Sequence, residues 1–213
     1  AYKHIVVRSP INPLIAPVMG HEFESLGALN PAAWSDGETT HLIYRAIAND
    51  GISRLSYANT RNGISLDAKS DGPVFSLAEP RSGIADKNKM YSRVMYPSGG
   101  SWGGCEDPRM VVLDDTVYVT FNAFYSWEYI RIAYITLSVK DFLAGNWDWS
   151  EPKYISPANE VNKNWTIFPE KIDGKFAVIY EIWPKIGVKY VDSLDDFVSR
   201  KVKTSKFWTN IKY

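Results

Sequence analysis

The sequence predicts an all-β protein built from the repeated sheets of a β-propeller. Three segments share one layout, in which a strand, a tight turn, a second strand, a polar loop and a third strand follow one another. The turns carry Asp-Gly or Asp-Asp between apolar residues, a strong hairpin signal because type I′ turns need residues that tolerate positive φ. A period of roughly 50 to 80 residues with three or four antiparallel strands is typical of propeller blades, which stack around a central channel.

We predict one domain over residues 1–213, with repeats near 30–70, 106–155 and 167–208. Each repeat begins with an Xaa-Pro pair, passes through an acidic turn and continues into two further strands. In order, these are Asn30-Pro31 with strands 40–46 and 52–57, Asp107-Pro108 with strands 117–123 and 130–135, and Phe168-Pro169 with strands 176–182 and 186–191.

Two sets of equivalent positions follow from this alignment. The first set opens each repeat and the second closes each middle strand: Asn30, Asp107 and Phe168, then Arg45, Asn122 and Glu181. Because equivalent positions of a propeller surround one channel, these mostly polar side chains are expected to converge on one site.

The segment 103–109 gathers three charges and a proline just before the apolar run 110–113. Proline lacks an N–H and suits the first residue of a strand, and it favours an extended conformation in the residue before it. Asp107 is therefore expected at a strand end. In a regular strand, alternation would turn Glu106 to the opposite face and leave Arg109 on the side of Asp107. An isolated Asp-Pro-Arg is more often a turn aspartate next to a structural arginine. The repetition of the segment instead favours a functional site at Asp107.

Composition narrows the classes of function. Formal net charge is zero at pH 7, so neither nucleic acid nor an anionic membrane is expected as a partner. One cysteine, Cys105, and three histidines give no disulfide framework and no zinc-binding spacing, so we expect no metal. The 8 Trp and 13 Tyr suit sheet packing and stacking on sugar rings. No stretch is apolar enough to cross a bilayer, which favours the cytoplasm unless a signal peptide has been removed.

Four blocks in order carry a family resemblance: Asn30-Pro31-Ala32-Ala33 with Tyr44-Arg45-Ala46 and 50–54, then 104–109, then Asn162-Lys163-Asn164, then 168–175. From about Ser9 onward the chain resembles glycoside hydrolase family 130. That family comprises inverting β-mannoside phosphorylases and related β-mannosidases on a five-bladed propeller. The resemblance implies cleavage of a β-mannoside with inversion, most simply by phosphorolysis to mannose 1-phosphate. It implies no cofactor, with inorganic phosphate as co-substrate.

The resemblance also implies roles for individual residues. Asp107 takes the place of the general acid, which needs a partly desolvated setting near another carboxylate to stay protonated. Cations should face the attacking phosphate, and Arg131 and Lys163 match basic positions of the family, with surface charge as the alternative for both. The expected substrate contacts are Asn30, Arg45, Asn122 and Arg109, of which Arg109 could equally serve to orient its own strand.

Two departures keep alternatives open. Family phosphorylases often carry a basic or imidazole pair where this chain has Tyr180-Glu181. Glu181 could instead act as the second catalytic residue and activate water, which would make the protein an inverting β-mannosidase. The chain also stops roughly two blades short at blade sizes of ~40 to 50 residues. Either it is a fragment, or a partner completes the ring.

Exposed edge strands pair readily with other chains, so we expect a homo-oligomer with Phe207 and Trp208 near the contact if the 213 residues are the whole protein. A carbohydrate-binding propeller without catalysis is a second hypothesis, and a protein-interaction propeller is a third.

Overall fold

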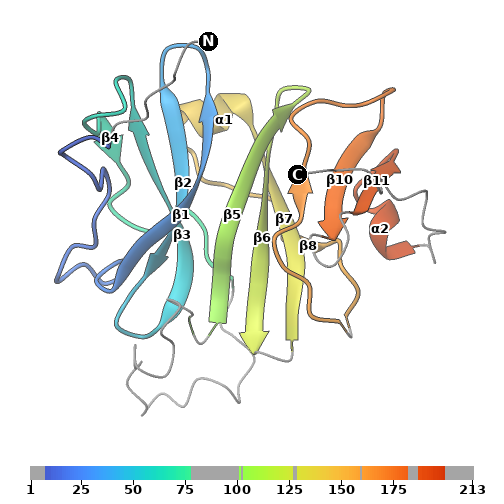
Figure 1. The fold of residues 1–213 in the computed structure, drawn as a ribbon, viewed down its shortest axis with the longest axis horizontal. Helices are drawn as coiled ribbons and strands as arrows, with labels where there is room; N and C mark the ends of the chain where they lie inside the picture. The colour runs from blue at the N-terminus through green and yellow to red at the C-terminus, as the bar shows by residue number, and fades with distance from the viewer. Residues whose placement is uncertain are drawn as a thin grey trace, which may run out of the picture.

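The computed structural model describes residues 8–77, 101, 103–126, 129–158, 160–181 and 187–199, and the side chain of Glu181 lies outside this description. Phe207 and Trp208, the expected contact between chains, also lie outside the described residues. Almost all regular structure is β (Figure 1). The elements are β1 Gly27–Ser35, β2 Thr40–Ile47, β3 Ile52–Thr60, β4 Ala68–Lys69, β5 Gly103–Leu113, β6 Thr116–Ser126, β7 Tyr129–Ser138, α1 Val139–Ala144, β8 Lys153–Tyr154, β9 Thr166–Ile167, β10 Phe176–Glu181, β11 Gly187–Val191 and α2 Asp196–Ser199.

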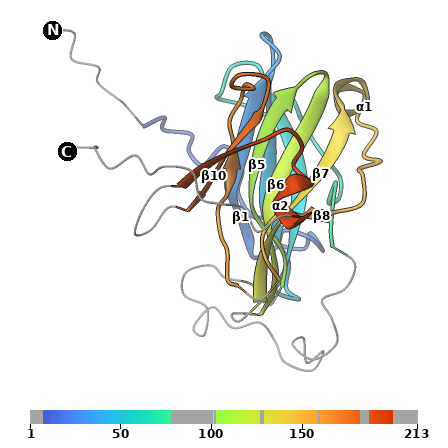
Figure 2. The same cartoon turned by 90° about the vertical axis from the view of Figure 1, so that its right-hand side faces the viewer.

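The strands form three antiparallel meanders arranged as blades. The first blade is β1-β2-β3-β4, the second is β5-β6-β7-β8, and the third is the separate sheet β9-β10-β11. A short parallel pairing of Ile52 and Ser53 with Gly103 and Gly104 joins the first two blades into one sheet. The leading strands β1, β5 and β9 lie next to one another. The blades follow one another from left to right in Figure 1, and in the side view of Figure 2 they overlap along the line of sight. The predicted all-β blade architecture is confirmed.

The predicted hairpin turns form with the expected backbone. Asp114 and Asp115 both have positive φ, 48° and 58°, as a type I′ turn requires. Asp173 and Gly174 do the same in the third blade, with φ of 51° and 74°. The first blade has a wider turn, in which Asp36 accepts hydrogen bonds from the backbone N–H groups of Glu38 and Thr39.

Packing against other parts of the chain buries both faces of the middle strands: β2 contributes to one cluster with the second blade and to another with residues before β1. One apolar cluster fills the space between the first and second blades, where Ile43, Val119 and Ile135 are fully buried. A second cluster, including Trp165 and Val178, lies between the second and third blades. Blades that are covered on both faces need apolar residues on both sides of each strand, which explains the nearly continuous apolar runs in β2 and β6. Neither helix in the described parts of the chain has the length and apolar character needed to cross a membrane.

A β-bulge recurs at the same place in β1 and β5. The register shifts between Leu29 and Ala32 in β1 and between Glu106 and Arg109 in β5. The bulged residues Asn30 and Asp107 have positive φ, 48° and 50°. Asp107 therefore lies inside β5 in a left-handed conformation, and the expectation of an extended residue at a strand end was wrong. A bulge inserts one extra residue into a strand and breaks its alternation.

The third blade corrects the alignment of the repeats. Ala32 of β1 pairs with Ile43 of β2, and Arg109 of β5 pairs with Thr120 of β6. Asn30 and Asp107 lie two residues before these paired positions. In the third blade the corresponding pair is Thr166 with Ile179, so the equivalent residue is Asn164, whose φ is 62°.

Phe168, which the sequence aligned with Asp107, lies just beyond β9. Pro169 follows it and cannot donate to the ladder, which is consistent with the early end of this strand.

Candidate functional site

Asp107 lies at the meeting point of side chains from three other strands. Its Oδ1 accepts hydrogen bonds from Asn30 Nδ2 of β1 at 2.6 Å and from Arg45 of β2 at 3.1 Å. Its Oδ2 accepts a longer contact from Asn122 Nδ2 of β6 at 3.5 Å. The carboxylate is 18% exposed, so a ligand can reach it. The structure thus brings four of the predicted site residues together, and their catalytic and binding roles stay predictions.

The orientation of the Asn122 amide is fixed by Asn164, which the alignment of repeats had missed. The backbone N–H of Asn164 donates to Asn122 Oδ1 at 2.8 Å. Because an N–H can only donate, the oxygen of this buried amide must face Asn164 and its NH₂ group must face Asp107. The sequence signal that could have identified Asn164 is its place in the block Asn162-Lys163-Asn164, together with the tolerance of Asn for positive φ.

Glu106 also belongs to the site, contrary to the expectation from strand alternation. The bulge lets two consecutive carboxylates reach the same guanidinium: Arg45 donates to Glu106 Oε1 at 2.9 Å and to Asp107 Oδ1 at 3.1 Å. Ser101 Oγ donates to Glu106 Oε1 at 3.0 Å, and Lys163 Nζ lies 3.5 Å from Glu106 Oε2. Glu106 is 2% exposed, so its charge is compensated almost entirely by protein groups.

Arg45 is held from several sides. Its Nε donates to Ser53 Oγ at 2.8 Å, while its two terminal nitrogens contact Glu106 and Asp107. The side chain is 4% exposed. A planar guanidinium engaged through all its nitrogens has one orientation, so Arg45 fixes Asp107 relative to the first blade.

The remaining predicted cations make other contacts. Arg109 donates to the carbonyl oxygens of Pro108 at 3.0 Å and Asp107 at 3.5 Å, which braces the bulge. The Arg131 guanidinium lies over the ring of Tyr154 at 4.3 Å and donates to the carbonyl of Ser156 at 2.7 Å. Substrate binding by Arg109 and phosphate binding by Arg131 therefore stay predictions.

The ring of Tyr154 is itself held by a hydrogen bond between its hydroxyl and that of Tyr125. Burial, followed by this hydrogen bond, raises the pKa of Tyr125. Burial raises the pKa of the Cys105 thiol to about 12, so this neighbour of Glu106 is not a thiolate nucleophile at neutral pH.

Glu181, the predicted alternative base, ends β10, where its backbone pairs with Gly187. Its side chain lies outside the described residues, so its role stays a prediction. Within the described ranges, no group of three or more His, Cys, Asp or Glu side chains is placed to hold a metal ion.

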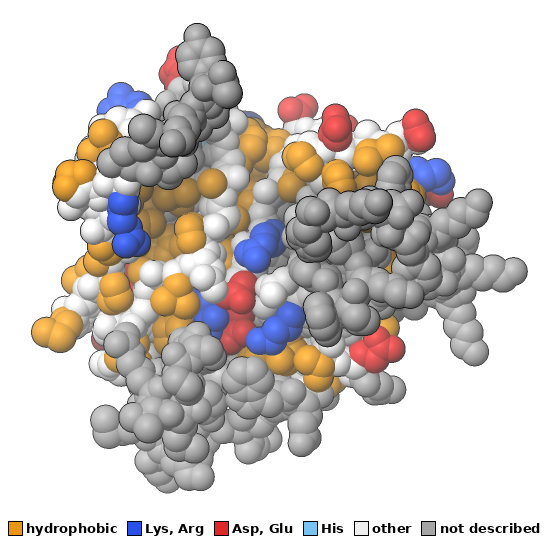
Figure 3. All heavy atoms as spheres, viewed as in Figure 1, with side chains coloured by type: hydrophobic (Ala, Val, Ile, Leu, Met, Phe, Trp, Pro, Cys, Tyr) orange, Lys and Arg blue, Asp and Glu red, His pale blue; other side chains and the backbone are white. Residues whose placement is uncertain are grey.

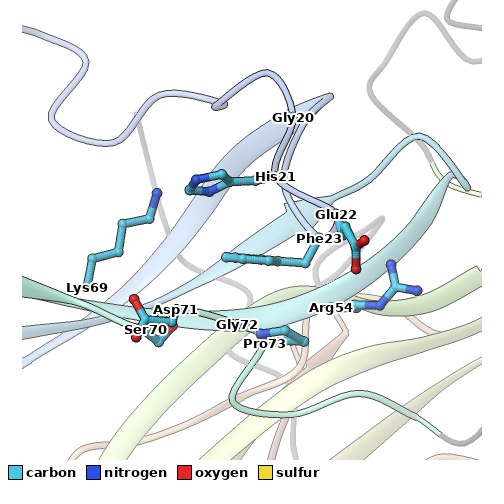
Figure 4. Close-up of a pocket in the computed structure, with 10 residues that line it drawn as sticks. All are labelled: Gly20, His21, Glu22, Phe23, Arg54, Lys69, Ser70, Asp71, Gly72 and Pro73. Atoms are coloured by element: carbon cyan, nitrogen blue, oxygen red, sulfur yellow. The ribbon is translucent and has the colours of Figure 1, made fainter.

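Two places on the described part of the surface can be compared as ligand sites. On the face seen in Figure 3, acidic side chains lie between basic ones near the centre. A second hollow of about 600 Å³ lies between the 20–23 segment and the 69–73 segment (Figure 4). Its two cations already have acidic partners, Lys69 with Glu24 at 2.5 Å and Arg54 with Asp50 at 2.6 Å. The group around Asp107 is the stronger candidate site, because side chains from three other strands converge there on a partly exposed carboxylate.

The chain is similar to two curated phosphorylases, although no model of a protein family matches it. It is 30% identical over 199 residues to a 1,2-β-oligomannan phosphorylase of Thermoanaerobacter sp. (strain X514), a match that covers 89% of this chain and 57% of that protein. It is 24% identical over 189 residues to a β-1,2-mannobiose phosphorylase of the same organism, covering 83% and 54%. The chain thus spans little more than half the length of these curated relatives.

A solved structure shares the fold. Its description reads that the GH130 family of mannoside phosphorylases contains glycoside hydrolases that target β-1,2 mannosidic linkages in Candida mannan. The TM-score is 0.62 at 24% identity, over 88% of this chain and 55% of that one. The fold of the described residues is therefore of the five-bladed β-propeller type, and they form three of its blades.

Proposed function

These similarities assign the chain to glycoside hydrolase family 130, and from that premise we propose that it acts in the cleavage of β-mannosides with inversion, by phosphorolysis. One observation carries the proposal: Asp107 is the partly exposed carboxylate on which Asn30, Arg45 and Asn122 converge from three strands. The names of the two phosphorylase relatives support a β-1,2-linked mannoside as substrate.

In the proposed reaction Asp107 is the general acid. Its Oδ1 accepts from two donors at 2.6 and 3.1 Å, whereas Oδ2 makes, among the described residues, only the longer 3.5 Å contact with Asn122. Oδ2 is therefore the oxygen that would deliver the proton to the glycosidic oxygen as the bond to the anomeric carbon breaks. General acid catalysis requires such a donor within hydrogen-bond reach of the leaving oxygen.

Inorganic phosphate is the proposed nucleophile. One of its oxygens would attack the anomeric carbon from the face opposite Asp107, so inversion of a β-mannoside gives α-mannose 1-phosphate. Lys163 supports this role because its side chain is 33% exposed and its ammonium lies beside the Arg45–Glu106 pair. Asn30, exposed and adjacent to Asp107, is the proposed contact for a sugar hydroxyl.

Two other functions fit the same site. Glu181 as a base would make the protein an inverting β-mannosidase, and the description of the solved structure supports this possibility because it places hydrolases within the family. A propeller that binds the mannoside without cleaving it would use the same contacts around Asp107. In that case the acid would bind a hydroxyl rather than protonate a leaving group.

Product analysis separates the three functions. The protein is incubated with β-1,2-mannobiose in the presence and absence of inorganic phosphate, and the products are identified by NMR. Phosphorolysis predicts α-mannose 1-phosphate only when phosphate is present. Free mannose without any phosphate requirement would favour the hydrolase, and binding without turnover would favour the carbohydrate-binding protein.

A further inference from the structure

We propose that Glu106 is a positioning residue of the second blade that links a cation of the first blade to a cation of the third and sets how strongly the site binds an anion. The proposal extends the proposed function, because the anion in question is the phosphate nucleophile. Arg45 comes from β2 of the first blade, Glu106 from β5 of the second, and Lys163 from the segment before β9 of the third. A single buried carboxylate contacts both cations.

The two oxygens of Glu106 have different partners. Oε1 accepts from Arg45 at 2.9 Å and from Ser101 Oγ at 3.0 Å, and all three residues are buried. Oε2 faces Lys163 Nζ at 3.5 Å, at the more exposed side of the group. A short charge-assisted contact to a rigid guanidinium holds the carboxylate itself, and the longer contact to Lys163 is the weaker of the two.

Charge explains why this arrangement affects anion binding. Glu106 is a single carboxylate that contacts both Arg45 and Lys163, so it offsets part of their positive charge before a ligand arrives. An incoming phosphate must compete with Glu106 for Lys163 and is repelled by the buried carboxylate. Glu106 therefore keeps Lys163 in place but weakens phosphate binding, which also favours release of the mannose 1-phosphate product.

The first test measures the Glu106–Lys163 interaction without relying on activity. Urea unfolding is measured for the parent protein, Glu106→Gln, Lys163→Met and the double variant, which form a double-mutant cycle. A second cycle combines Glu106→Gln with Lys69→Met and serves as the control, because Lys69 contacts Glu24 instead of Glu106. We expect coupling of about threefold or more in the unfolding equilibrium constant for the first pair and additivity within about twofold for the control. Additivity in both pairs would overturn the proposal. If Glu106→Gln does not fold, Glu106→Asp takes its place in the cycle.

The second test separates anion control from general loosening of the site. Calorimetry gives the dissociation constants of inorganic phosphate and β-1,2-mannobiose for the parent protein, Glu106→Gln and Ser101→Ala. Ser101→Ala is the control, because it removes a hydrogen bond to Glu106 but keeps the charge of the carboxylate. We expect Glu106→Gln to tighten phosphate binding about fivefold and to change mannobiose binding by less than about twofold. Ser101→Ala should change neither.

Weaker binding of both ligands to Glu106→Gln would overturn the proposal in favour of a purely structural role. A parent protein that binds mannobiose but not phosphate would contradict phosphorolysis. The unfolding cycle would then decide the Glu106 interaction alone.

Discussion

Asp107 owes its place in the site to side chains that hold it from two blades. Asn30 and Arg45 belong to the first blade and engage Oδ1, whereas Asn122 belongs to the second and faces Oδ2. Each donor removes one way in which the carboxylate could turn, so the acid is fixed before the substrate binds. Such preorganisation is what a proton transfer in the transition state requires.

Lys163→Ala tests the cation beside this acid. If Lys163 binds the phosphate nucleophile, its loss should raise the apparent KM for phosphate about tenfold or more, because a charge-assisted contact disappears. The KM for β-1,2-mannobiose should change by less than about threefold. Lys140→Ala, an exposed lysine on α1, is the matched control. Equal increases in both KM values would show that Lys163 has no special relation to phosphate.

The sequence predicted part of this site at the residue scale. Repetition identified Asn30, Asp107, Arg45 and Asn122, because equivalent positions of blades meet around one centre. It placed Glu106 on the wrong face and missed Asn164, because both inferences assumed a regular strand or an exact repeat. A bulge of one residue reverses alternation, and nothing in the composition of the segment 103–109 distinguishes a bulge from a regular strand.

At the scale of the elements, the hairpins follow from their turn residues. Asp-Asp and Asp-Gly supply two positive φ values in the second and third blades, as predicted. In the first blade the turn is stabilised by a side chain instead: the Asp36 carboxylate accepts hydrogen bonds from the turn backbone and contacts the buried His41. The length of a turn is therefore less predictable than its position, because a capping side chain can support a wider loop.

The Asp36 turn gives a pH prediction. The backbone N–H groups of Thr39 and Glu38, followed by His41, lower the pKa of Asp36 from 3.8 to about 2. A lowered pKa in the folded state adds stability that is fully present above pH 3.8 and is lost as the pH falls through about 2. Urea unfolding of the parent protein and Asp36→Asn should therefore differ by a constant amount above about pH 5, and the difference should shrink below pH 4. A difference that stays the same down to pH 3 would show that this carboxylate is not linked to folding.

At the scale of the whole molecule, the site depends on the relative position of the blades. Gly104 pairs with Ser53 where the first two blades join, two residues before Glu106. Its φ is 103°, and a Cβ added there would lie 2.1 Å from the Ser53 carbonyl oxygen. Ser53 also accepts the hydrogen bond from Arg45 Nε, so this joint and the site share a residue.

Gly104→Ala should therefore destabilise both the fold and the site. We expect the free energy of unfolding to fall by about 2 to 4 kcal/mol, because backbone strain and a clash with a carbonyl act together. Gly174→Ala is the control: its φ is 74° but nothing lies within 4 Å of the added Cβ. It should lose only about 1 kcal/mol in the same denaturant titration. Equal losses in the two variants would mean that the joint between the blades contributes nothing beyond backbone strain.

The central claim is that Asp107 protonates the leaving group of a β-mannoside. The most direct measurement is the turnover of Asp107→Asn on β-1,2-mannobiose and on an aryl β-mannoside with a good leaving group, with phosphate present. The amide keeps the shape, and its oxygen can still accept from Asn30 and Arg45, but it cannot transfer the proton, so turnover of mannobiose should fall about 10² to 10⁴-fold. Turnover of the aryl mannoside should fall much less, and binding of mannobiose should stay within about threefold. Activity on mannobiose within tenfold of the parent protein would contradict the assignment of Asp107 as the general acid.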